Sequence, residues 1–145
     1  DDLICFDNFH LLRIKEEWMH LKDAIMAIFL SSLRVFGINL YGRANFGGGA
    51  LDIKVFELLQ MPFLNPQLID SYETEQLKLA INSILKRKIL SYREEIKQKD
   101  LQLIDRIVFS KLGFSKSEIQ QFQQALSNFI DNRLIKAQKL KKDTN

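Results

Sequence analysis

At 145 residues, the chain has the length of one domain, or of two small units that share a core. Apolar residues make up 46% and charged residues 27%, which excludes wholesale disorder, and the formal charge of +3 is too small to indicate a nucleic-acid partner by itself. A single cysteine excludes an internal disulfide, and the longest apolar run, residues 24–30, is far shorter than a membrane span. We therefore expect a soluble, cytoplasmic chain without a membrane partner, and a start without Met suits an excised piece of a longer protein.

Positive charge is concentrated in the second half of the chain. Residues 1–64 carry six Lys/Arg and eight Asp/Glu, a net charge of −2, whereas residues 65–145 carry fifteen and ten, a net charge of +5. The lysines at 136, 139, 141 and 142 form a short positive tail. A solvated terminus explains this tail as well as an anionic partner does.

The first elements predicted are strands and then a helix. Residues 3–6 and 9–14 are short runs rich in Ile and aromatics around the turn-prone pair Asp7-Asn8, which predicts a strand or small hairpin. From Glu16 the apolar residues recur at helical spacing as far as Phe36, and Gly37 is a plausible stop. The apolar positions that define this helix are Trp18, Leu21, Ile25, Ile28, Phe29 and Phe36.

A glycine-rich segment, residues 40–51, holds four of the six glycines. Ordering a Gly triplet is costly, so tight packing or a ligand has to compensate. Asp52 is expected to cap a short helix through Leu59, which Pro62 and Pro66 end. The two prolines predict that residues 61–66 form a linker between a first unit, 1–64, and a second unit, 67–145.

The second unit is expected to be a helical bundle. Gly113 should end its second helix, and Ser115 with Glu118 forms a capping box before the third. Its three apolar stripes are Leu77, Ile81, Ile84, Leu85, Ile89, Tyr92 and Ile96; then Leu101, Ile104, Val108 and Leu112; then Ile119, Phe122, Leu126, Phe129, Ile130 and Leu134. The expected fold is therefore mainly α, and α+β overall, with a small N-terminal α/β piece before the bundle.

The residue types required for catalysis are poorly placed. His10 and His20 stand alone without a second zinc ligand at helical spacing, and Cys5 has no neighbouring cation in the sequence that would activate its thiol. Asp105 is unusual because it interrupts an apolar run, and an internal salt bridge or a hydrogen bond to a neighbouring helix is its expected role. No catalytic residue or metal site is predicted.

The glycine segment carries the sharper chemical signal. Arg43, Asn45 and the backbone N–H groups of residues 47–49 suit phosphate oxygens, and the two side chains also suit base edges. The spacing matches neither a P-loop nor a dinucleotide fingerprint. A loop that packs against another backbone, with Tyr41 and Phe46 inside, remains the alternative.

Several motifs follow one another in a specific order along the chain: Phe6-Asp7-Asn8-Phe9, Phe29-Leu30-Ser31-Ser32-Leu33, the segment from Tyr41 to Ile53, Met61-Pro62, the run from Leu103 to Phe109, the run from Leu112 to Ile119, Arg133, and Lys136-Ala137. Their order resembles the C-terminal region of DNA adenine-N6 methyltransferases of restriction–modification systems. The resemblance covers most of the chain and is weakest over residues 66–97.

The resemblance implies a role that is not catalytic. The family's catalytic domain binds S-adenosylmethionine through a Gly-rich strand-turn motif and flips adenine beside an "(N/D)PP(Y/F)" motif. This chain lacks both motifs: Asn65-Pro66 begins like the second one, but Gln67 and Leu68 follow in place of the second Pro and the aromatic residue. The chain would be the end of the target-recognition region plus a helical tail, next to the catalytic domain. It would touch duplex DNA through Arg43, Asn45, Gly47, Gly48, Gly49 and Lys54. The alternative is a helical protein-interaction module without DNA contact.

Overall fold

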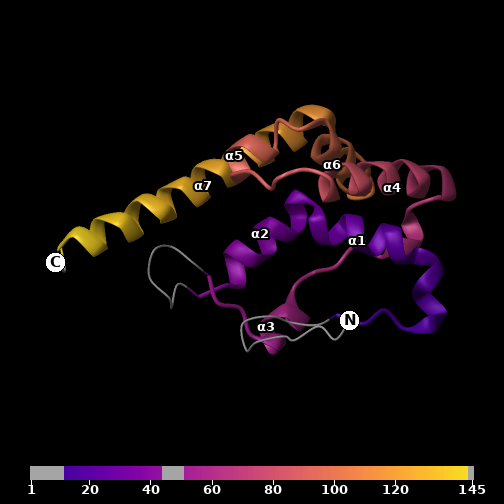
Figure 1. The fold of residues 1–145 in the computed structure, drawn as a ribbon, viewed down its shortest axis with the longest axis horizontal. Coiled ribbons are helices and arrows are strands. Elements are labelled where there is room, and N and C mark those ends of the chain that lie inside the picture. Colours follow the sequence, from indigo (N-terminus) through magenta and orange to yellow (C-terminus); the bar gives the residue numbers. More distant parts are fainter. Residues whose placement is uncertain (1–11, 44–50, 144–145) are drawn as a thin grey trace.

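The computed structural model describes residues 12–43 and 51–143, and these residues are mainly helical (Figure 1). The elements in chain order are η1 (Glu16–Leu21), α1 (Lys22–Leu30), α2 (Ser32–Tyr41), α3 (Val55–Gln60), η2 (Pro66–Leu68), α4 (Ser71–Leu85), α5 (Tyr92–Glu95), α6 (Lys99–Ser110) and α7 (Lys116–Asp143). The prediction of a mainly helical chain with a C-terminal bundle is confirmed for this part.

The expected α+β character of the first unit is not seen. The described residues contain no strand, and residues 12–14, the end of the second predicted strand, are neither helix nor strand. Leu12 and Ile14 instead line a hollow that Trp18 also lines, and Leu12 is 56% exposed. Residues 3–6 and 9–11 lie outside the described part.

The predicted helix from Glu16 to Phe36 is divided into three pieces. Ser31 adopts an extended conformation between α1 and α2, and the two sides of this break are bent by 59°. Gly37 does not end a helix: it lies within α2, where an added Cβ would be 3.2 Å from the sulfur of Met61. The apolar period runs through the break because both halves face the same core, so periodicity alone could not reveal it.

The region around α3 also differs from the prediction. Asp52 does not cap the helix, because it pairs through its backbone with Arg43, and the helix begins only after Lys54. α3 ends at Gln60, immediately before Met61 and Pro62. Met61 and Leu64 are buried, so the predicted linker takes part in the packing.

One core joins both predicted units. Ala24, Ala27 and Ile28 of α1 pack with Leu77 and Ile81 of α4 and with residues of α6. The first stripe of the bundle ends earlier than predicted: the chain leaves α4 after Leu85, and Leu85 and Ile89 are 65% and 64% exposed.

The two predicted helix signals at residues 113–118 are confirmed. Gly113 has φ +81°, a conformation that L side chains rarely adopt, and the next N–H donates to the carbonyl of Phe109. The backbone N–H of Ser115 donates to Glu118, while the Ser115 hydroxyl accepts from the N–H of Glu118 at 3.4 Å. These short-range contacts turn the chain from α6 into α7.

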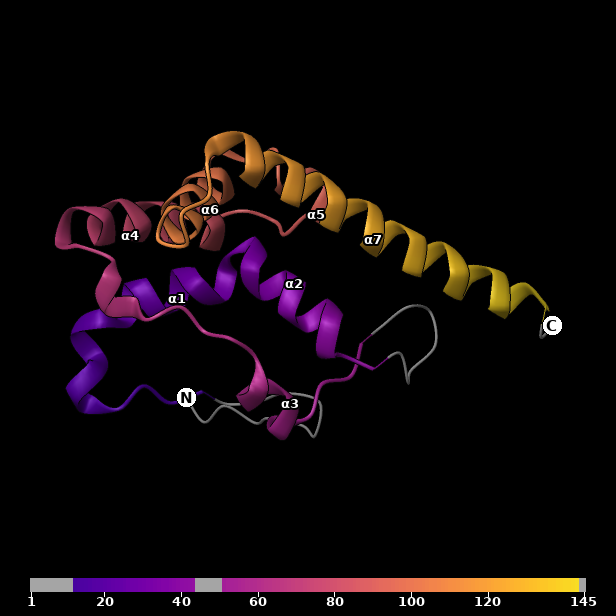
Figure 2. The ribbon, with the colours of Figure 1, turned by 180° about the vertical axis from the view of Figure 1, so that it is seen from behind.

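α4, α6 and the first half of α7 lie on one side of α1 and α2, and α3 lies on the other side (Figures 1 and 2). Among residues 116–139 of α7, the buried side chains are Ile119, Gln123, Leu126 and Ser127, all in the first half of the helix. The second half extends away from the bundle toward the C-terminus (Figure 1).

Asp105 of α6 holds the break between α1 and α2 in place. This fully buried carboxylate accepts from the backbone N–H of Ser32 at 2.7 Å, from the Ser32 hydroxyl, and from the amide of Gln123 at 2.6 Å. Tyr92 donates to the Ser32 hydroxyl at 2.7 Å. Burial raises the pKa of the Asp105 carboxyl, and the hydrogen bonds oppose that shift. The predicted internal hydrogen-bonding role is thus confirmed, and the carboxylate sits where a helix N-terminus favours an anion.

We expect Asp105→Ala to lower the free energy of unfolding by about 2–5 kcal/mol, because buried donors on Ser32 and Gln123 lose their acceptor. Asp105→Asn should cost less, since it keeps one acceptor oxygen. Asp131→Ala, which removes a more exposed partner of Arg93, is the matched control and should cost about 1 kcal/mol or less. Chemical denaturation of the four proteins measures this, and equal losses for the two alanine variants would contradict it.

A second polar cluster closes the loop between α4 and α6. Arg87 binds Glu95 at 2.7 Å and Asp100 at 2.8 Å, and both carboxylates are largely buried. Hydrogen bonds from the guanidinium lower the pKa values of the Glu95 and Asp100 carboxyls. The cluster ties α5 to the start of α6 through one guanidinium.

Lowered carboxyl pKa values stabilise the fold above the unfolded-state pKa of about 4, and this stabilisation is lost as the pH falls through the folded values. The melting temperature of the wild type should therefore fall more steeply than that of Arg87→Gln as the pH is lowered from about 5 to about 2. Lys78→Gln, at an exposed pair, should follow the wild-type curve. Parallel curves for wild type and Arg87→Gln would refute this linkage.

Candidate nucleic-acid interface

An antiparallel bridge joins the two ends of the glycine-rich segment. The N–H of Arg43 donates to the carbonyl of Asp52 at 2.7 Å, and the N–H of Asp52 donates back at 2.8 Å. Gly42 precedes the bridge, and a Cβ there would be 2.5 Å from the carbonyl oxygen of Ile38. Only glycine fits this close approach, so α2 can lead directly into the bridge.

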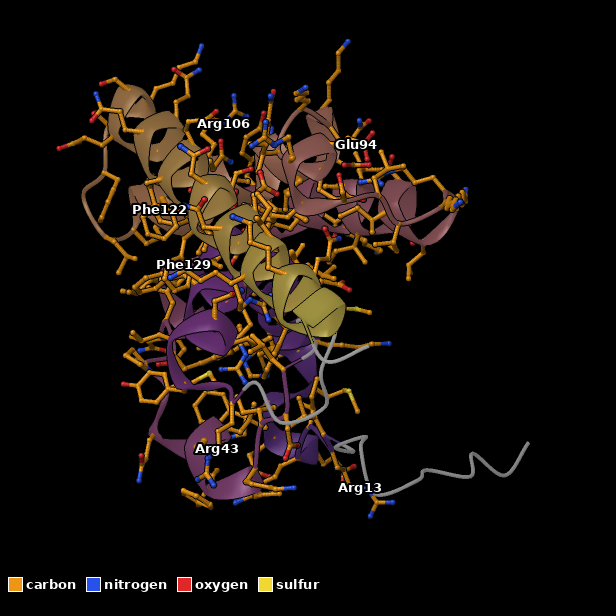
Figure 3. The ribbon with its side chains drawn as sticks, turned by 90° about the vertical axis from the view of Figure 1, so that its left-hand side faces the viewer. Arg13, Arg43, Glu94, Arg106, Phe122 and Phe129 are labelled. Carbon is orange, nitrogen blue, oxygen red and sulfur yellow. The ribbon has the colours of Figure 1, made fainter. Side chains whose placement is uncertain are left out.

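Arg43 is held in one orientation at this position. Its Nε donates to Glu57 at 2.6 Å, and its guanidinium carbon lies 5.4 Å from the centroid of the Phe56 ring. The side chain of Arg43 is 49% exposed, whereas that of Glu57 is nearly buried. Figure 3 shows Arg43 at the edge of the molecule.

The other predicted cation, Lys54, is also paired. Its Nζ lies 2.8 Å from the carboxylate of Asp52, which is largely buried. The positive charges of Arg43 and Lys54 are therefore balanced by the negative charges of Glu57 and Asp52, and the DNA-binding role of the two cations stays a prediction. Asn45, Gly47, Gly48 and Gly49 lie outside the described part, so their DNA-binding role stays a prediction.

Glu57 orients Arg43, and the sequence analysis did not identify this role. One oxygen accepts from Arg43 Nε and the other from the backbone N–H of Lys54 at 2.8 Å, which caps α3. In the described structure, Glu57 is the carboxylate that binds Arg43, and it engages Nε alone, so the two terminal nitrogens keep their donors. These donors suit a phosphate oxygen or the edge of a guanine. The sequence signal for the capping role of Glu57 was its position at the third residue of α3, where a glutamate can accept from the backbone N–H that precedes the helix.

A second group of cations lies between α6 and α7. Lys99, Arg106 and Lys116 line a hollow of about 350 Å³, and no carboxylate lies among the described lining residues. The remaining lining residues are Gln102, Leu103, Ile119, Gln120 and Gln123. Arg106 and Arg43 lie toward opposite ends of the molecule in Figure 3, so the two groups form separate surfaces.

Within residues 12–43 and 51–143, no three His, Cys, Asp or Glu side chains gather as metal ligands. No single helix of that part has the length and apolar character to cross a membrane; residues 16–30 and 32–41 meet both requirements only as a bent pair. No protein-family model, curated protein or solved structure matches the chain.

We expect Glu57→Ala to destabilise the loop base, because it removes both the cap of α3 and the acceptor of Arg43. The loss should be about 1–2 kcal/mol, the size of a helix cap. Amide hydrogen exchange of Arg43 and Asp52 should accelerate, while Glu75→Ala at an exposed pair should leave it unchanged. Unaltered exchange in Glu57→Ala would show that Glu57 does not support the bridge.

Proposed function

We propose that this chain is a non-catalytic part of a site-specific DNA adenine-N6 methyltransferase of a restriction–modification system, and that it helps to position duplex DNA. The resemblance carries the family assignment, through the order of its motifs from Phe6 to Arg133. S-Adenosylmethionine would bind the catalytic domain, which would lie N-terminal to this chain.

One observation of the structure supports the DNA contact: Arg43 is fixed by Glu57 through Nε and keeps its terminal nitrogens. An arginine that is already oriented loses less side-chain entropy when it binds a phosphate or a base edge. The contact relies on directed hydrogen bonds rather than on net positive charge, because Glu57 and Asp52 balance the local cations.

The proposal is tested with the chain and a fluorescent duplex of arbitrary sequence. Binding without sequence preference should be weak at physiological salt, with a Kd of about 10⁻⁴ to 10⁻⁶ M, and tighter at low salt. Arg43→Ala should weaken it, and the slope of log K against log salt concentration should become shallower by about 0.9, the effect of one lost phosphate contact. Fluorescence anisotropy over a range of salt concentrations measures both effects.

Arg106→Ala is the matched control, since Arg106 lies on the separate surface between α6 and α7. It should leave the slope nearly unchanged. A loss confined to Arg106→Ala would place the duplex on the α6–α7 surface and remove Arg43 from the contact. An unchanged curve for Arg43→Ala has the same consequence for Arg43.

A second candidate function is a protein-interaction module, and residues 129–135 of α7 favour it. Phe129 and Ile135 are 53% and 49% exposed on a helix that extends away from the bundle (Figures 1 and 3). Exposed apolar side chains on a projecting helix suit the groove of a neighbouring subunit. A chain that binds no DNA at any salt concentration would make this function the better supported one.

A further inference from the structure

A mostly apolar hollow of about 440 Å³ lies between the start of η1, the helices α1 and α2, and the segment around α3. Its apolar lining residues are Leu12, Ile14, Trp18, Ile25, Phe29, Leu58, Leu59, Met61 and Phe63. Its charged lining residues are Arg13, Lys15 and Arg34, and no carboxylate lies among the described lining residues. The hollow thus combines an apolar surface with positive charge alone.

Arg34 is the most buried of the three cations. Only 6% of this residue is exposed, although it carries a full charge on α2. Nη1 lies 2.9 Å from the sulfur of Met61, and the guanidinium carbon lies 4.9 Å from the centroid of the Phe29 ring. The described residues provide no carboxylate within ion-pairing distance of Arg34. Burial lowers the pKa of its guanidinium.

A thioether and a ring face are weak partners for a buried guanidinium. Burying a charge is costly unless an opposite charge or several hydrogen bonds compensate. Arg43 shows the usual solution in this chain, because the nearly buried Glu57 binds it directly. Arg34 has no such partner among residues 12–43 and 51–143, and it lines an open hollow, so an anion that enters the hollow would supply the compensation.

We propose that this hollow binds a small apolar molecule that carries one carboxylate, with the carboxylate on Arg34 and the apolar body against Trp18, Phe29 and Phe63. Ligand sites of this kind typically have volumes of about 300–1,000 Å³ and an apolar lining with few polar groups. The planar guanidinium fork matches a carboxylate through two N–H donors. One carboxylate matches the one buried cation of the lining, because Arg13 and Lys15 are exposed and a second negative charge would have only these solvated cations as partners.

The inference is independent of the proposed DNA contact. Arg34 and Arg43 use different partners, Met61 and Glu57, and the bridge at the loop base does not line the hollow. Loss of one function would therefore leave the other testable.

The single tryptophan of the chain provides the measurement, because Trp18 lines the hollow and is partly exposed. Octanoate is the probe, and 1-octanol, which has the same alkyl chain without the charge, is its control. Titration followed by Trp18 fluorescence should show octanoate binding at least tenfold tighter than 1-octanol.

Arg34→Met keeps a long apolar side chain without the charge, and it should abolish the preference for octanoate over 1-octanol. Arg34→Lys should retain part of the preference, because it keeps the charge but loses the fork. Arg106→Met is the matched control on the other surface and should bind octanoate like the wild type. Circular dichroism verifies that each variant is folded.

Three outcomes would overturn the proposal: no octanoate binding, equal binding of octanoate and 1-octanol by the wild type, or an undiminished preference in Arg34→Met. The comparison of the two probes uses the wild type alone, so it decides even where Arg34→Met fails to fold.

Discussion

The arrangement of the helices depends on the contact between the Asp105 carboxylate and the first residue of α2. Ser31 interrupts the helix, and the free N–H of Ser32 needs an acceptor inside the core. Asp105 supplies it from α6, and Gln123 of α7 binds the same carboxylate. One buried carboxyl group therefore connects three helices, and it fixes the direction in which α2 leaves the break.

The direction of α2 in turn decides where two arginines lie. Arg34, near the start of α2, is buried beside Phe29 and Met61, whereas Arg43 lies just beyond its end at the bridge with Asp52. Both positions follow from the same helix axis. Gly37 and Gly42 allow the close contacts that this axis requires, one with Met61 and one with the carbonyl of Ile38.

The two arginines represent different electrostatic solutions. Glu57 neutralises Arg43 and also fixes its orientation, which leaves directed donors but little net charge. Arg34 is buried without a carboxylate among the described residues, and this leaves charge where water is scarce. A paired and oriented guanidinium suits recognition of a polar surface, whereas an uncompensated one in an apolar hollow suits a ligand that brings its own charge.

Much of the local structure was determined by the sequence alone, because its causes lie within a few residues. Apolar spacing predicted α6 and α7, and Gly113 and the Ser115–Glu118 box marked the turn between them. The glycine segment also identified Arg43 as a candidate contact, although its ion pair with Glu57 was not expected.

Only the tertiary structure decided the break at Ser31, the burial of Arg34 and the grouping of Lys99, Arg106 and Lys116. The acceptor that stabilises the break lies 73 residues away, so no local pattern could reveal it. Apolar periodicity records which side of a helix faces the core. It does not record which distant polar group meets a free N–H, because that depends on how separate helices pack.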